Sequence, residues 1–312
     1  MTKKLLLLFF FNCLLLNNTL IARTQTTLDY QDRIHAVSSE NFMVVSQNIH
    51  ATEAGYEILN KGGNAVDAAV AVGFALAVTL PRAGNLGGGG FMLIYNKENN
   101  KVETIDYRSA APRSAKSEMF INDESNVVRF GHLVNAVPGS VAGLIKAHNN
   151  HGKLGFAEVM KPAIRLAKNG IPVTHDLKYA LEWSKESLLE NVTSKNKFYD
   201  KEENPIEVTS LFKQPKLAKT LFLISRKGKK AFYEGEIAEM IIDEVTESGG
   251  IMTIEDLKNY RSIWRDPVRF KYKELDIISM SLPSSGGILL GQMLKAIENY
   301  DISSYGHNSL KA

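Results

Sequence analysis

The sequence predicts a layered α/β domain, in which helices pack against short antiparallel strands. Its 312 residues, 44% hydrophobic and 23% charged, are enough to bury a sizeable core. A glycine run at 87–90 leads into two strand-like segments, 91–95 and 101–106, joined by a polar turn. A second strand pair is expected at 268–280, and helix patterns flank both pairs. Helices around hairpin strands are typical of a layered fold.

The first expected elements are a short strand at 43–46 and a helix at 50–61 that ends before a Gly-Gly pair. Asn64 is a good N-cap for the next helix, 65–80, which stops before a proline. This second helix is apolar nearly all round. We therefore expect it to be buried in the protein core.

The remainder of the domain is expected to be mainly helical. Ser140 is expected to cap a helix that runs to about 148, and Thr253 begins another, through 259, in a capping-box-like pattern. A charged stretch, 190–207, is expected to be a loop, and the basic residues 226–230 to form a helix C-terminus favoured by the helix dipole. Further helices are expected at 156–169, 177–189, 215–226, 235–247 and 288–299.

The N-terminus has the pattern of a secretory signal peptide. Lys3 and Lys4 precede an apolar run at 5–16, and Ala22 is a small residue at a suitable cleavage point. The alternatives are a retained membrane anchor and, in a poor context, lipidation of Cys13, the single cysteine. The expected organisation is a signal peptide at 1–22, a polar leader at 23–41 and a domain at 42–312. We therefore expect a periplasmic or secreted protein without stable membrane association.

The charge balance gives no reason to expect a nucleic-acid partner. The formal net charge is +3, and removal of the two lysines of the signal segment leaves +1.

Arg108 is the candidate binding residue. It follows the strand-like segment 101–106, so a hairpin would present its guanidinium beside the glycine run. A guanidinium held in this way is suited to bind a carboxylate through two parallel hydrogen bonds. An ordinary surface ion pair is the alternative. The glycines permit close approach of backbone or substrate, or a left-handed backbone, and a phosphate cradle is disfavoured because no Lys-Ser/Thr follows them.

Other chemistry-bearing residues have ordinary interpretations. Ser284 and Ser285 lack the Gly-x-Ser-x-Gly context of a serine hydrolase and are expected to form a turn and a helix cap. His148 and His151 are close in sequence, and we expect them to be solvated at a helix end rather than to bind a metal.

Several motifs of this sequence match those of one known family and follow one another in the same order. They are Gly62 to Ala69, Gly84 to Phe91, Asp106-Tyr107-Arg108 with Ala111-Pro112, Val137 to Ser140, Thr253 to Leu257 and Pro283 to Gly287. From about Phe42 onward the chain resembles the γ-glutamyltransferase family (γ-glutamyl transpeptidase, glutathione hydrolase). The resemblance implies that Arg108 binds the α-carboxylate of the γ-glutamyl group, although Ser109 stands where many members have glutamate.

The resemblance also implies a fold and a reaction. The fold is the αββα sandwich of N-terminal-nucleophile hydrolases, made as a precursor that cuts itself. The threonine exposed by that cut attacks the γ-glutamyl bond of glutathione, and the acyl group passes to water, an amino acid or a peptide. No metal or organic cofactor is implied.

The sequence departs from the family's pattern at the nucleophile. No Thr-Thr-His motif occurs; the nearest approaches are Thr26-Thr27, followed by Leu28, and Thr174-His175, preceded by Val173. We therefore expect a partial sandwich that lacks the small-subunit half, with no catalytic residue in this chain and no activity by itself. The alternatives are a non-catalytic remnant, a periplasmic module that binds γ-glutamyl compounds, and a component of a related amide acylase.

Overall fold

The computed structural model describes residues 36–121 and 128–311. The expected signal peptide, 1–22, lies outside the described residues, and so does most of the polar leader. Contacts divide the chain into residues 1–43 and a compact unit of 44–312. The helices and strands of this unit are, in chain order, α2 (Ile49–Asn60), α3 (Ala65–Thr79), β1 (Phe91–Asn96), β2 (Lys101–Asp106), α4 (Ser140–His151), α5 (Phe156–Asn169), β3 (Ile171–Pro172), α6 (His175–Trp183), α7 (Lys185–Leu189), α8 (Val192–Phe198), β4 (Leu211–Phe212), α9 (Pro215–Lys227), α10 (Lys229–Tyr233), α11 (Glu236–Glu247), α12 (Ile254–Asn259), β5 (Ile263–Arg265), β6 (Val268–Tyr272), β7 (Leu275–Ser279) and α13 (Gly286–Ile297). Among the described residues, no helix combines the length and the apolar character needed to cross a membrane.

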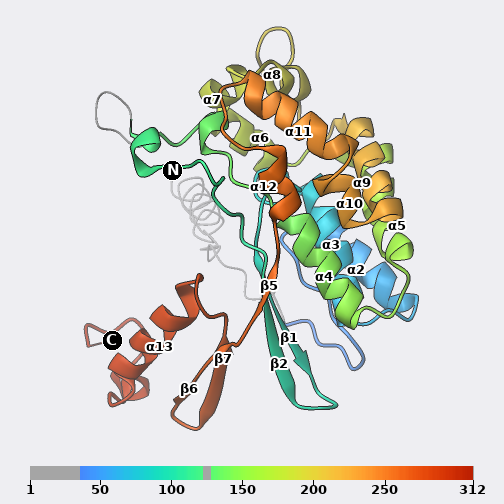
Figure 1. The fold of residues 1–312 in the computed structure, drawn as a ribbon. Coiled ribbons are helices and arrows are strands. Elements are labelled where there is room, and N and C mark those ends of the chain that lie inside the picture. The colour runs from blue at the N-terminus through green and yellow to red at the C-terminus, as the bar shows by residue number, and fades with distance from the viewer. Residues whose placement is uncertain (1–35, 122–127, 312) are drawn as a thin grey trace, which may run out of the picture. The chain divides into compact units, whose positions relative to one another are not determined.

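The core is built around α3, which packs against α2, α4 and α5 (Figure 1). Most of its residues are buried, and Val70, Phe74 and Val78 are fully enclosed. Asn64 begins the helix with a complete capping box, as its side chain accepts from the third helical N–H and Asp67 bonds back to the Asn64 N–H. The predicted buried helix and its cap are confirmed.

The carboxylate of Asp67 is fully buried and tied to the loop that follows α4. It accepts hydrogen bonds from the backbone N–H groups of Asn64, Lys153 and Leu154 at 3.0–3.2 Å. His148 Nε2 lies 3.4 Å from Asp67 and 3.0 Å from the Leu154 carbonyl. The expectation that His148 is solvated is therefore wrong, because the last turn of α4 points this ring into the core.

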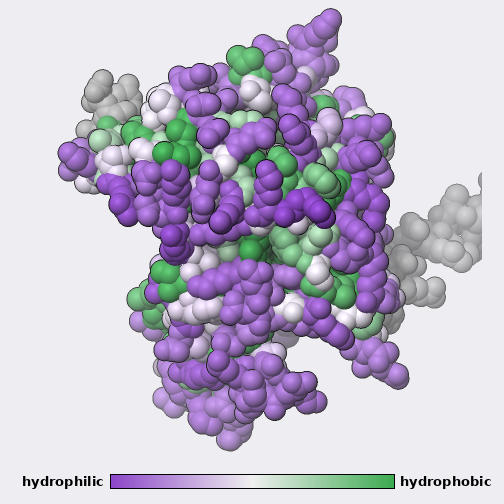
Figure 2. Space-filling model, turned by 45° about the vertical axis from the view of Figure 1, so that its right-hand side comes forward, coloured by the Kyte–Doolittle hydropathy of each residue, from purple (hydrophilic) through white to green (hydrophobic). Residues whose placement is uncertain are grey.

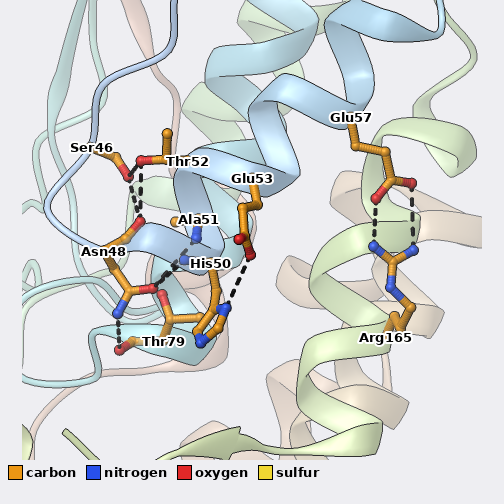
Figure 3. A network of polar contacts seen from close by, with 9 residues as sticks. All are labelled: Ser46, Asn48, His50, Ala51, Thr52, Glu53, Glu57, Thr79 and Arg165. Atoms are coloured by element: carbon orange, nitrogen blue, oxygen red, sulfur yellow. Dashed lines mark hydrogen bonds and ion pairs between the residues drawn. The ribbon is translucent and has the colours of Figure 1, made fainter. Parts of the chain in front are cut away.

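A second polar network fixes the N-terminus of α2 (Figure 3). The Asn48 side chain accepts from the N–H groups of His50 and Ala51, and its amide donates to the Thr79 carbonyl at the end of α3. Further along α2, Arg165 of α5 donates both ends of its guanidinium to the Glu57 carboxylate. These contacts hold three helices of the core in register.

The hairpin predicted at 91–106 forms the principal sheet. β1 and β2 pair antiparallel from Phe91–Asp106 to Asn96–Lys101. β5 then pairs with the other edge of β2, with Ile105 opposite Trp264 and Asp106 opposite Ile263. Strand β5 was not expected from the sequence, because three residues are too few to show a period-2 pattern.

Several other expectations need correction. Residues 43–46 form no strand with any described residue, and Gly139, rather than Ser140, occupies the N-cap position of α4. The helix expected at 177–189 is interrupted at Ser184, and the loop expected at 190–207 contains the short helix α8, capped by the Asn191 side chain. Gly228, with φ of 60°, ends α9 and lets the basic stretch continue into α10.

The strand pair expected at 268–280 is confirmed as β6 and β7, and α13 packs on it. Gly287 is the only residue of α13 that is buried within the described part of the chain. Much of the exposed side of α13 is apolar and includes Ile288, Leu289, Leu290, Met293 and Ile297. Patches of hydrophobic residues also interrupt the mainly hydrophilic surface in the view of Figure 2. Apolar patches of this kind are typical of surfaces that contact other protein.

Removal of the Asp67 carboxylate should destabilise the core. In Asp67→Ala, three backbone N–H donors lose their fully buried acceptor, and we expect the free energy of unfolding to fall by about 3 kcal/mol. Denaturant unfolding of the chain measures this change. The matched control is Asp243→Ala on the exposed surface of α11, which should change stability by less than about 0.5 kcal/mol. Equal stability of the two variants would contradict the structural role of Asp67.

Candidate anion-binding site

The end of the β1–β2 hairpin holds the backbone of Arg108 from two directions. The Asp106 carboxylate accepts a hydrogen bond from the Arg108 N–H at 2.9 Å. On the other side, the hydroxyl of Tyr260, just after α12, donates to the Arg108 carbonyl at 2.8 Å. The backbone at this position is therefore fixed by one group from β2 and one from a segment about 150 residues later.

The side chain of Arg108 is exposed and makes no hydrogen bond or ion pair with any residue that the structure describes. It lines a hollow of about 510 Å³, a size suited to a small molecule. The walls come from the end of β2, the segment after it, α12 and β5; the charged and aromatic residues among them are Asp106, Arg108, Arg113, Asp256, Tyr260, Arg261 and Arg265. The surface-ion-pair alternative for Arg108 finds no carboxylate partner among the described residues.

The glycine run lies against the backbone that carries Arg108. Gly90 and Tyr107 exchange two backbone hydrogen bonds, and the Gly88 carbonyl accepts from the N–H groups of Gly139 and Ser140. A Cβ added at Gly89 would lie 2.4 Å from the Ser109 nitrogen. None of the four glycines has a positive φ. Of the two expected reasons for glycine, close approach of backbone applies here and a left-handed conformation does not.

Asp106 and Asp256 anchor the floor of the hollow. Asp106 forms an ion pair with Arg265 at 2.8 Å, and β5 brings this arginine into place beside β2. Asp256 accepts from the Arg113 N–H and from the N–H and hydroxyl of Thr253. Burial by itself would raise the pKa of Asp256, but these hydrogen bonds outweigh it and lower the pKa below its ordinary value. Asp256 is therefore ionised at neutral pH.

Two tyrosines keep their protons: Tyr107, which precedes Arg108, and Tyr260, which lines the hollow. Burial raises the pKa of Tyr107 to about 12, and its ring packs against Gly90 and Gly143. Burial, assisted by the negative charge of Asp106, raises the pKa of Tyr260 far above its ordinary value. The Tyr260 hydroxyl is therefore a permanent hydrogen-bond donor to the Arg108 carbonyl.

The remaining candidates contribute little to this site. Ser284 Oγ accepts a weak hydrogen bond from Gly286 N–H at 3.4 Å, and Ser285 occupies the N-cap of α13 without a capping bond from its side chain. The expected turn is confirmed, because the Ser284 N–H donates to the Ser281 carbonyl, but the expected helix cap amounts only to the weak bond at Ser284. Within residues 36–121 and 128–311, no three His, Cys, Asp or Glu side chains are grouped so that they could hold a metal ion.

The fold is that of an α/β protein, and the hollow beside Arg108 is a candidate site for a small anion. Comparisons with known proteins give the family. The sequence model of gamma-glutamyltranspeptidase matches residues 51–312. The chain belongs to the gamma-glutamyltranspeptidase family.

Sequence and structural relatives agree on this membership. The glutathione hydrolase proenzyme of Escherichia coli is 41% identical over 286 residues, which cover 90% of this chain and 49% of that protein. The crystal structure of Helicobacter pylori gamma-glutamyltranspeptidase is 40% identical, with a TM-score of 0.85 over 89% of this chain and 80% of that one. The enzyme from Pseudomonas nitroreducens is 37% identical, with a TM-score of 0.81 over 88% of this chain and 82% of that one. The partial N-terminal-nucleophile hydrolase fold is thereby confirmed, and the chain spans about half the length of the curated relatives it matches.

Close backbone approach at Gly89 gives a direct test. In Gly89→Ala, the new methyl group meets backbone atoms of Tyr107 and Ser109, and we expect a loss of about 2 kcal/mol in the free energy of unfolding. In Gly87→Ala, the nearest atom is the Asn85 side-chain oxygen at 3.4 Å, so the change should stay below about 0.5 kcal/mol. Thermal unfolding compares the two variants. If Gly89→Ala were as stable as Gly87→Ala, the glycine run would not be needed for packing.

The raised pKa of Tyr107 predicts a loss of stability in alkali. The unfolded chain releases this proton near pH 10, whereas the folded chain keeps it until about pH 12. Stability is therefore complete below pH 10 and falls by about 1.4 kcal/mol per pH unit between these values. Tyr107→Phe should remove this contribution, measured as the difference in unfolding free energy from the unsubstituted chain at pH 9 and 11. Tyr179→Phe, at an exposed position on α6, is the control; parallel curves for Tyr107→Phe and the unsubstituted chain would contradict the assignment.

Proposed function

We propose that this chain is the large-subunit portion of a γ-glutamyltransferase or glutathione hydrolase, and that Arg108 binds the α-carboxylate of the γ-glutamyl group. The observation that carries the proposal is an arginine with a fixed backbone and no carboxylate partner among the described residues, at the edge of a hollow of about 510 Å³. Family membership supports the γ-glutamyl group as the ligand.

The nucleophile belongs to a part of the family fold that this sequence does not contain. The sequence has no Thr-Thr-His, and the relatives it matches are about twice as long. Acyl transfer needs a nucleophile, its base and oxyanion donors together. In this proposal a small subunit supplies these groups, while this chain supplies Arg108 and the pocket walls. The N-terminal pattern supports export to the periplasm or beyond.

Two alternatives to this proposal are a component of a related amide acylase and a non-catalytic remnant or binding module. A cephalosporin acylase from Bacillus halodurans shares the fold at a TM-score of 0.74, but at only 25% identity. The higher identity to γ-glutamyl enzymes favours a γ-glutamyl ligand over another amide. A non-catalytic remnant or binding module would keep Arg108 without a nucleophile, and the coding sequence downstream distinguishes it: a Thr-Thr-His frame favours the enzyme.

Arg108→Gln should weaken substrate binding in the assembled enzyme. With the chain co-produced with the subunit that carries the threonine, release of a chromophore from a γ-glutamyl anilide is measured. Loss of a charge-assisted pair is worth about 1.5–3 kcal/mol, so KM should rise about ten- to hundredfold, with a smaller change in kcat. Arg269→Gln, at an exposed position on β6, should have normal kinetics. An unchanged KM for Arg108→Gln, or cleavage of glutathione by this chain unaided, would overturn the corresponding part of the proposal.

A further inference from the structure

The hollow beside Arg108 has more positive charge than one carboxylate requires. Four guanidinium groups and two carboxylates line it, which leaves a surplus of two positive charges. Arg108 accounts for one of these charges under the proposed function. The other must come from Arg113, Arg261 or Arg265.

Arg265 is excluded from this surplus because it is paired. Its Nε donates to Asp106 at 2.8 Å, and the Asp106 side chain is only 8% exposed. The remaining oxygen of Asp106 accepts from the Arg108 N–H. Asp106 therefore neutralises Arg265, and among the described residues it forms no ion pair with a second arginine.

Asp256 is likewise occupied by its anchoring role. Its carboxylate accepts hydrogen bonds from two backbone N–H groups and the Thr253 hydroxyl. The charge of Arg113 contributes to the lowered pKa of Asp256, but the two side chains form no ion pair within 4.0 Å. Asp256 thus holds the backbone of Arg113 in place, while the Arg113 side chain is exposed and can bind a ligand.

Arg261 is positioned by its own neighbours. Its Nη1 donates to the Lys258 and Tyr260 carbonyls at 2.6 and 2.8 Å. These bonds use one of the three nitrogens of the guanidinium, and the others bond to no residue that the structure describes. Arg113 lies in the segment after β2, and Arg261 lies in the segment after α12. Both residues line the same hollow as Arg108.

We propose that Arg113 and Arg261 bind a second carboxylate, carried by the amine portion of the γ-glutamyl compound one residue from the γ-amide bond. The inference rests on the proposed function, which places the α-carboxylate at Arg108. Arg108 would bind one carboxylate of the ligand, and Arg113 with Arg261 would bind the other. The site would therefore bind γ-glutamyl amino acids more tightly than γ-glutamyl amides whose amine portion is neutral. Arg113 and Arg261 are on this basis specificity-determining residues.

Binding of two matched dipeptides to the full chain tests the inference. γ-Glutamyl-glycine and γ-glutamyl-glycinamide differ only in the second carboxylate, and isothermal titration measures the Kd of each. For an exposed pair we expect the acid to bind about fivefold more tightly than the amide at low salt. This preference should shrink at high salt, because the interaction is exposed to solvent.

The variants separate this inference from the proposed function. Arg113→Gln should reduce the preference for the acid to near unity while leaving the Kd of the amide unchanged, and Arg261→Gln is the second variant should the first fail to fold. Arg108→Gln should weaken both dipeptides alike. Arg226→Gln, at the exposed end of α9, removes the same charge outside the hollow and should change neither Kd. Circular dichroism verifies the fold of each variant.

Each result has one meaning. Equal affinity for acid and amide in the unsubstituted chain overturns the second-carboxylate site while leaving Arg108 in its role; the arginine surplus would then serve acidic side chains of the rest of the enzyme. A preference that persists in both Arg113→Gln and Arg261→Gln also overturns it. Binding of neither dipeptide overturns the proposed function and, with it, this inference.

Discussion

The close packing of backbone against backbone at residues 88–90, 107–109 and 139 is the constraint on which the rest of the site depends. Gly90 bonds to Tyr107, Gly88 bonds to Gly139, and an added Cβ at Gly139 would lie 1.9 Å from the Tyr107 carbonyl oxygen. No side chain fits between these segments. The hairpin end that carries Arg108 is therefore held at main-chain distance from α4, and it inherits the rigidity of the helical core.

Electrostatics then decides which charges remain available. The two carboxylates that line the hollow are bonded to neighbouring protein groups. Asp106 pairs with Arg265 and accepts from the Arg108 N–H. Asp256 accepts from Thr253 at the start of α12 and from the Arg113 N–H. A buried carboxylate is stabilised by the N–H and guanidinium groups that donate to it. Asp106 and Asp256 are held in this way and form no ion pair with the exposed arginines Arg108, Arg113 and Arg261 of the described chain. Among the described residues the guanidinium of Arg108 has no carboxylate partner, and this is the chemical basis of the proposed γ-glutamyl site.

The local elements near the site could be predicted because each has its own sequence signal. The hairpin 91–106 alternates around a polar turn, α3 begins at the Asn64–Asp67 capping box, and α12 begins with another box at Thr253–Asp256. The misses share a physical cause. β5 is three residues long and exists because β2 offers it an edge, and α8 forms in a stretch whose polar composition resembles a loop.

The sequence by itself determined the family, the hairpin and Arg108 as the candidate residue, since these depend on neighbouring residues and on motifs that survive without coordinates. Only the tertiary structure decided which charges meet. His148 was expected in solvent and lies against Asp67. Arg265 reaches Asp106, Tyr260 reaches Arg108 and Asp256 reaches Arg113, each across about 150 residues of chain. Such pairings have no sequence period, because they are set by how helices and strands pack and not by the spacing of residues along one element.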